Sequence, residues 1–131
     1  MPVSYRDTHD VDIEQLAALF TSVGWQARAA DRARLRQQVD GAMFVVSAWD
    51  GDKLAGFARA ISDGATNAYI STVAVLPTHQ RQGIGRELIY RLTSGRKGLL
   101  FVLHADAGVT EFYLRCGFER AENMLRIPRA Y

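Results

Sequence analysis

The feature that most constrains this chain is the change from a strand to a helix between Val73 and Leu88. An apolar run that ends at Leu76 leads through a polar turn with two glycines, Gly83 and Gly85, into apolar residues at helical spacing. Glycine lets a backbone approach a bound group closely, and the free N–H groups and positive dipole end at a helix start attract anions. The turn therefore predicts a site for a phosphate group.

The spacing of this turn separates it from two other phosphate-binding loops. A P-loop needs a lysine after its second glycine, and Arg86 follows Gly85, so a P-loop is excluded. The dinucleotide pattern Gly-x-Gly-x-x-Gly begins at Gly83, but Leu88 stands where the third glycine should be, which leaves a nicotinamide-binding module as a weak alternative. What remains is Gln80-x-x-Gly83-x-Gly85, and it resembles the acetyl-coenzyme A loop of the GNAT N-acetyltransferase superfamily.

A second block strengthens the resemblance. The run Phe112-Tyr113-Leu114-Arg115-Cys116-Gly117-Phe118 is similar to the Phe-Tyr-x-x-x-Gly-Phe signature near the end of GNAT domains. The two blocks stand in family order and at family spacing. A length of 131 residues suits one domain. The chain is therefore identified as a single GNAT acetyltransferase domain over residues 1–131.

Composition limits the other classes. A net charge of +2 is too small to indicate a nucleic acid or membrane partner. No apolar run approaches the roughly 20 residues that span a bilayer, and the N-terminus lacks a signal-peptide core, so a cytoplasmic location is expected. One cysteine excludes an internal disulfide framework.

Periodicity and turn residues predict alternating elements with short connections. Asp10 is the predicted N-cap of the first helix, Gly24 ends that helix, and the strand over 98–104 is predicted to be buried. The predicted strands are 3–6, 43–49, 53–62, 67–75, 98–104, 118–120 and 124–127; the predicted helices are 11–23, about 29–39, one with a stripe at 84, 88 and 92, and one with a face at 109, 112, 113 and 116.

This order resembles the GNAT fold, an α/β (α+β) class with a mixed, mostly antiparallel central sheet and helices on both faces. In that family two central parallel strands, here those ending at Val75 and His104, splay apart, and the gap receives the pantetheine arm of acetyl-coenzyme A. The arm pairs with strand backbone as if it were another strand. The resemblance implies that the co-substrate contacts Val73, Ala74, Val75, Gln80, Arg81, Gln82, Gly83, Ile84, Gly85 and Arg86, with its pyrophosphate on the amides of 81–85.

The same resemblance implies two catalytic groups. The backbone N–H of Val73 is expected to stabilise the oxyanion that forms on the thioester carbonyl. Tyr113 is a core aromatic by its spacing, but it stands where many GNAT enzymes keep the acid that protonates the departing thiolate. A phenol and a thiol have pKa values close enough for that transfer. Cys116, on the same helical face, is interpreted as an inert small hydrophobe.

The acceptor side is less defined. Some GNAT members carry a glutamate where this chain has Tyr69, and a neutral tyrosine is a poor base. Asp63 and His104 are therefore the candidate bases. His104 is also explained as a strand-end residue bonded to backbone. Trp25 and Tyr69 are candidates to line the acceptor pocket. Arg28 belongs to a set of helical arginines that favours a solvated face, or else it pairs with a substrate carboxylate. The residues predicted to bind the acceptor are Trp25, Arg28, Tyr69 and His104.

The resulting hypothesis is an N-acetyltransferase that moves acetyl from acetyl-coenzyme A to a primary amine of a small molecule, by direct attack in a ternary complex. It needs no metal ion. The alternatives are a non-catalytic acetyl-coenzyme A binding module that regulates a partner, and a protein N-acetyltransferase. Because GNAT domains frequently dimerise, a homodimer is a further expectation from the resemblance.

Overall fold

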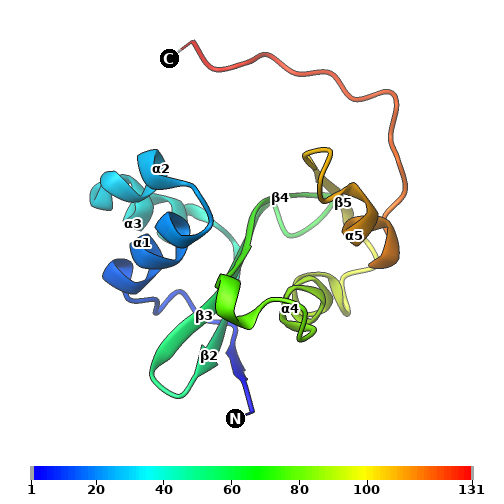
Figure 1. The fold of residues 1–131 in the computed structure, drawn as a ribbon. Helices are drawn as coiled ribbons and strands as arrows, with labels where there is room; N and C mark the ends of the chain where they lie inside the picture. The colour runs from blue at the N-terminus through cyan, green and yellow to red at the C-terminus, as the bar shows by residue number, and fades with distance from the viewer. Residues whose placement is uncertain (1, 131) are drawn as a thin grey trace.

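A sheet of five strands, in the order β1-β2-β3-β4-β5, forms the centre of the molecule (Figure 1). The computed structural model describes residues 2–130. Neighbouring strands are antiparallel except for β4 and β5, which are parallel. The strands are β1 (Ser4–Arg6), β2 (Phe44–Asp50), β3 (Lys53–Ser62), β4 (Asn67–Val75) and β5 (Leu100–Leu103). The predicted mixed, mostly antiparallel sheet is confirmed.

Helices cover both faces of this sheet, as predicted (Figure 1). On one face, Phe20 and Leu35 belong to a buried core that includes Phe57 of β3. On the other, Leu88 and Leu92 pack with Ile70 of β4. No helix within residues 2–130 has both the length and the apolar character needed to cross a membrane. The helices are α1 (Ile13–Ser22), α2 (Gln26–Ala30), α3 (Arg32–Gly41), α4 (Ile84–Thr93) and α5 (Thr110–Arg115), with a 3₁₀ turn at Pro77–His79.

The first helix begins later than predicted. Its N-cap is Asp12, whose carboxylate accepts a hydrogen bond from the N–H of Glu14 at 3.0 Å, so the prediction of Asp10 was wrong. Between these aspartates, Val11 is buried in the core. The burial of Val11 fits a helix that begins only after Asp12. Residue type alone could not decide between Asp10 and Asp12, because both are aspartates.

We expect Asp12→Ala to lower the free energy of unfolding by about 1 kcal/mol, because the first turn of α1 loses its capping acceptor. Asp10→Ala is the matched control, since no hydrogen bond to the Asp10 side chain occurs within residues 2–130, and it should change stability by less than about 0.5 kcal/mol. Urea unfolding monitored by far-ultraviolet circular dichroism measures both values. Equal losses in the two variants would contradict the assignment of the cap.

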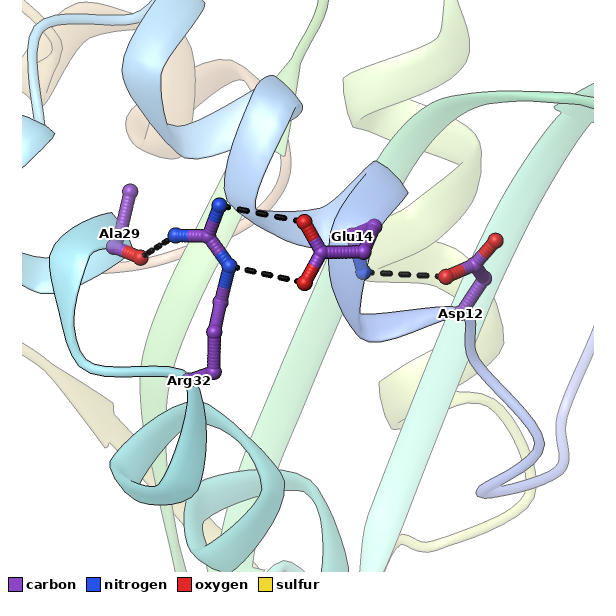
Figure 2. A network of polar contacts seen from close by, with 4 residues as sticks. All are labelled: Asp12, Glu14, Ala29 and Arg32. Carbon is purple, nitrogen blue, oxygen red and sulfur yellow. Dashed lines mark hydrogen bonds and ion pairs between the residues drawn. The ribbon is translucent and has the colours of Figure 1, made fainter.

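The second predicted helix is two helices. Asp31 has an extended backbone, with φ −101° and ψ 91°, and its carboxylate accepts from the N–H of Arg34 at 3.0 Å, so it ends α2 and caps α3. Figure 2 shows how Arg32 joins these helices to α1: its guanidinium binds both carboxylate oxygens of Glu14, at 3.0 and 3.1 Å, and also donates to the backbone oxygen of Ala29. Arg32 therefore has a structural role, because it holds the starts of α1 and α3 and the end of α2 together.

The end of the chain differs from the prediction. Residues 118–120 and 124–127 form no strand, and Leu125 and Ile127 are 95% and 97% exposed. After α5 the chain crosses back over the molecule toward α2 (Figure 1). The strand over 98–104 is shorter than predicted and only partly buried, because β5 is an edge of the sheet. Apolar alternation indicates a strand, but a strand also needs a neighbour, and the sequence does not specify one.

Candidate active site

Strands β4 and β5 share only a short stretch of pairing. Their register runs from Asn67 opposite Leu100 to Ile70 opposite Leu103, while β4 continues to Val75. Within residues 2–130 no strand pairs with this edge of β4 beyond Ile70. Strands β4 and β5 therefore diverge, and backbone groups of β4 beyond Ile70 have no strand partner on this side within residues 2–130.

The hydrogen bonds at the end of β4 identify which groups face the gap. The N–H of Leu76 donates to Ala55 of β3 at 2.8 Å, whereas the oxygen of Val75 accepts from the Gln80 side chain at 3.1 Å. Opposite residues of an antiparallel pair alternate between bonded and non-bonded pairs. Val75 and, by the same alternation, Val73 direct their backbone groups away from β3 and toward the gap. An extended ligand arm can pair with this edge.

The glycine turn follows directly. Arg81 and Gly83 both have left-handed backbone conformations, with φ of 64° and 84°, and Gln80 to Gly83 are exposed. Such a conformation costs about 1–2 kcal/mol for a residue with a Cβ, and strain of this kind clusters at ligand sites. Gly83 is the N-cap of the ten-residue α4, with no side chain bonded to the N–H groups of the first turn. Those N–H groups are free to meet an anion.

Gly85 also has a packing role that the sequence did not predict. A Cβ at this position would lie 3.1 Å from Cζ of Phe112 and 3.8 Å from Cγ2 of Val75. It therefore lets the aromatic side chain of α5 pack on the start of α4, and does not simply clear room for a ligand. The two sequence blocks are in direct contact, so the turn, the end of β4 and α5 form one site.

Tyr113 lies in the aromatic group beside this contact. Its ring packs edge-on against Phe112 and Phe118, with centroid distances of 5.1 and 5.7 Å, and its hydroxyl has no hydrogen bond within residues 2–130. Burial raises the pKa of Tyr113 to about 12, with smaller contributions from Cys116 and Asp106. The phenol is therefore fully protonated at neutral pH. Its pKa is also further from that of a thiol than the pKa of an unperturbed phenol is.

The base of the turn contains a contact that sequence reasoning missed. Nε2 of His79 lies 2.9 Å from Oδ2 of Asp50, and Nδ1 lies 2.8 Å from the hydroxyl of Thr78. This pair attaches the segment after β4 to the end of β2. The two residues are 29 positions apart, and only the sheet topology brings them together.

The His79 contact predicts a pH effect on stability. The hydrogen bond from His79 lowers the pKa of Asp50 below its usual 3.8. A folded-state pKa below the unfolded one adds stability above about pH 4, and this stability is lost as the pH falls through the folded value. We expect Asp50→Asn to be less stable than the parent at pH 6, with the difference narrowing by pH 3. Urea titrations at both values measure it, and a constant difference would contradict it.

A cleft of about 710 Å³ lies on the α2–α3 face of the sheet. Two of the predicted acceptor residues, Arg28 and Tyr69, line it. Trp25 does not: its ring packs on Phe20, with centroids 5.2 Å apart, and supports the Arg28 guanidinium at 4.5 Å. The lining comprises Ala27, Arg28, Asp31, Arg34, Gln37, Gln38, Gly41, Arg59, Ile61, Tyr69, Ser71 and Arg129.

The two candidate bases have different surroundings. The Asp63 carboxylate accepts hydrogen bonds from Thr66 and Ala65 in the turn between β3 and β4, and these bonds hold the pKa of Asp63 well below its usual range. It is therefore a weak base. His104 is exposed directly after β5, where pairing with β4 stops, and it lies outside the lining of the cleft.

The cysteine and the acidic and histidine side chains give no sign of a reactive thiol or a metal site within residues 2–130. Burial raises the pKa of the Cys116 thiol, which fits an unreactive packed cysteine. Residues 2–130 contain no group of three or more histidine, cysteine, aspartate or glutamate side chains that could hold a metal ion.

The curated proteins that are similar to this chain include several named as acetyltransferases. The chain is 36% identical over 121 residues to an uncharacterized ycf52-like N-acetyltransferase of Prochlorococcus marinus, covering 87% of this chain and 66% of the relative. It is 36% identical over 125 residues to histone acetyltransferase TAP1 of Glycine max, with 84% and 53% covered. It is 30% identical over 128 residues to the chloroplastic serotonin N-acetyltransferase 2 of Oryza sativa, with 92% and 63% covered.

A solved structure and a family model complete the comparison. A probable acetyltransferase of meticillin-resistant Staphylococcus aureus superimposes with a TM-score of 0.85 at 25% identity, covering 99% of this chain and 100% of that one. The chain spans about half to two thirds of the length of the curated relatives above. The model of the acetyltransferase (GNAT) family matches residues 11–118. With the diverging strands, the glycine turn and this match together, the chain belongs to the GNAT acetyltransferase family.

Proposed function

We propose that this chain transfers an acetyl group from acetyl-coenzyme A to a primary amine of a small molecule, by direct attack within a ternary complex. The observation that carries the proposal is the edge of β4 at Val73 and Val75, which has no strand partner within residues 2–130 and leads straight into the glycine turn at the start of α4. One part of this surface suits an extended amide-containing arm, and the next suits a pyrophosphate.

Acetyl-coenzyme A, when bound, supplies the acetyl group as a thioester. The backbone of Val73 and Val75 would pair with its arm, and the N–H groups from Arg81 to Gly85 would bind its pyrophosphate. Ala74 and Ile84 are 5% and 3% exposed, so they would contribute backbone and core packing only. The exposed side chains of Gln82, Arg81 and Arg86 would add polar and positive groups at the mouth of the site.

The catalytic roles follow from the same surface. The N–H of Val73 would donate to the carbonyl oxygen as negative charge develops on it. Tyr113 would donate its phenolic proton toward the departing sulfur; because its pKa is about 12, the hydrogen bond to developing charge matters more than complete transfer. No carboxylate on β4 can deprotonate the ammonium, so we assign that step to water or to His104, which is exposed directly after β5 and lies outside the lining of the cleft.

A small acceptor is favoured by the cleft. Its volume of about 710 Å³ lies within the usual range for small-molecule sites. The names of the relatives include both a serotonin and a histone acetyltransferase, so protein N-acetylation is the competing assignment. Some relatives are chloroplastic by name, and the cytoplasmic location stays a prediction, as does the homodimer.

An acceptor screen tests the proposal. Purified protein is mixed with acetyl-coenzyme A and single amines, including amino acids, polyamines, arylalkylamines and lysine peptides, and free thiol release is followed by its absorbance with a disulfide reagent. We expect release with at least one small amine and a matching acetylated product by mass spectrometry. Release with lysine peptides alone would support protein acetylation. Tight binding of acetyl-coenzyme A by calorimetry with no amine-dependent release would support the regulatory module.

A further inference from the structure

Arg59 occupies an unusual position on the floor of the cleft. It is only 9% exposed, although it carries a guanidinium group on β3, in the middle of the sheet. Its side chain donates to the hydroxyls of Thr72 and Ser71, both at 3.0 Å. Both partners are neutral, and no carboxylate forms an ion pair with Arg59 within residues 2–130. A buried charge without a counter-ion is costly to retain, unless an anion binds to it.

The surroundings of Arg59 add positive charge. Arg28 and Arg129 line the same cleft, and they approach closely enough that their charges, after the larger effect of burial, lower the pKa of Arg59. Asp31 is the one acidic residue in the lining, and it already caps α3 and pairs with Arg34 at 3.9 Å. The cleft therefore has a strong excess of positive charge at its floor and rim.

A bulge in β4 lies directly beside Arg59. The register between β3 and β4 shifts after Arg59, which pairs with Thr72, while Ala60 pairs with Ile70, so Ser71 is the extra residue. Both Ser71 and Tyr69 consequently line the cleft. Ser71 accepts a hydrogen bond from the guanidinium, and the Tyr69 side chain lines the same cleft.

We propose that this cleft binds an anionic group, a carboxylate or a phosphate, on the amine acceptor, and that Arg59 is the residue that recognises it. The inference rests on the proposed acetyl transfer, since it names the class of acceptor. Arg28 and Arg129 complete the site from α2 and from the C-terminal segment. A planar guanidinium offers paired N–H donors that match either anion.

The position of Arg59 also fits the chemistry along β4. It is bonded to Thr72, the residue before Val73, where the thioester carbonyl is expected. At about 3.3 Å per strand residue, the bonded groups of Arg59 lie within roughly 7 Å of Val73 along the strand. A short amino acid or amino phosphate spans this distance, with its anion on Arg59 and its amine at the reacting carbon.

Equilibrium binding tests the anion site without relying on catalysis. Calorimetry or nuclear magnetic resonance titration compares N-acetylglycinate with the neutral N-acetylglycinamide, and N-acetyl-O-phosphoethanolamine with N-acetylethanolamine. We expect the anion of at least one pair to bind about tenfold or more tightly than its neutral partner, and the pair that responds identifies carboxylate or phosphate. Arg59→Gln should abolish the difference, and Arg59→Lys should retain part of it. Equal binding within both pairs would overturn the inference.

The variants need controls because Arg59 is buried. Urea unfolding establishes that Arg59→Gln is folded, and Arg28→Gln, at an exposed position, provides a second loss of affinity for the anion that does not depend on the buried site. Arg91→Gln is the matched control, since Arg91 pairs with Glu87 on α4 at 2.7 Å and lies outside the cleft. It should bind the anions as the parent does. If only Arg91→Gln weakened binding, the site would lie elsewhere.

Acetylation of the corresponding free amines separates this inference from the proposed function. We expect kcat/KM for glycine or O-phosphoethanolamine to exceed that of glycinamide or ethanolamine about tenfold or more, and Arg59→Gln to remove the preference. Acetylation of charged and neutral amines at equal rates would overturn the anion site and leave the acetyltransferase intact. Anion binding lost in Arg59→Gln, with no thiol release from any amine, would support the site and contradict the acetyltransferase.

Discussion

Tyr113→Phe is expected to lower kcat about 100- to 1,000-fold with a good amine acceptor, while leaving the affinity for acetyl-coenzyme A nearly unchanged. The fall in kcat is expected because the variant lacks the one hydroxyl that donates a hydrogen bond to the charge developing on the departing sulfur. The ring contacts with Phe112 and Phe118 remain in the variant. The hydroxyl has no partner within residues 2–130, so its removal should change the free energy of unfolding by less than about 0.5 kcal/mol.

Three measurements decide this prediction: steady-state kinetics with saturating acetyl-coenzyme A, calorimetry for its binding, and urea unfolding. Tyr90→Phe is the matched control, since Tyr90 is 61% exposed on α4, and it should retain full activity. Undiminished kcat in Tyr113→Phe would remove Tyr113 from the mechanism. A fall in both activity and stability would indicate a packing role.

The raised pKa of Tyr113 also limits what pH profiles can reveal. Burial raises the pKa of this phenol to about 12, so the protonated form that donates persists across the working range. Deprotonation of Tyr113 should therefore cause no loss of activity between about pH 7 and pH 10. Any group with a midpoint in that range, such as the amine of the acceptor, lies elsewhere.

The parts of the fold that were predictable depend on local signals. The bounds of β3 and β4 are those predicted, because the turns at Asp50-Gly51 and Asp63-Gly64 limit both strands. The turn before α4 was also predictable from a local signal, since glycines mark a change of backbone direction in the sequence itself. The closing strands were not, because their apolar residues depend on a neighbouring strand that is absent from residues 2–130.

The candidate site divides in the same way. The proposed donor side rests on two contiguous blocks, so its residues could be predicted from the sequence. The position of Arg59 in the cleft could not be predicted, because a single arginine in an apolar strand forms no recognisable sequence pattern. Its proposed role rests on burial, on the bulge at Ser71 and on the approach of Arg28, and each of these depends on tertiary structure.

Gly85→Val is expected to destabilise the protein by about 1–3 kcal/mol and to weaken acetyl-coenzyme A binding, because it separates α4 from α5. The new Cβ would lie 3.1 Å from Phe112, and the valine methyl groups would press further into the same ring. Phe112 cannot move freely, since it packs on Tyr113. Displacement of α5 would then disturb both the turn that we propose to bind the pyrophosphate and the position of the phenol.

A double-mutant cycle with Phe112→Ala isolates this contact. If the clash is with the ring, Gly85→Val should cost much less in the Phe112→Ala background, with a coupling of about 1 kcal/mol or more between the two positions. Gly98→Val is the matched control, because a Cβ there meets nothing within 4 Å, and it should change unfolding and binding little. Gly83→Ala separates backbone strain from the steric clash at Gly85. Its φ of +84° is strained for any residue with a side chain, while the space around it is open. An equal cost of Gly85→Val with and without the Phe112 ring, measured by urea unfolding, would contradict the idea that Gly85 joins the two motifs into one site.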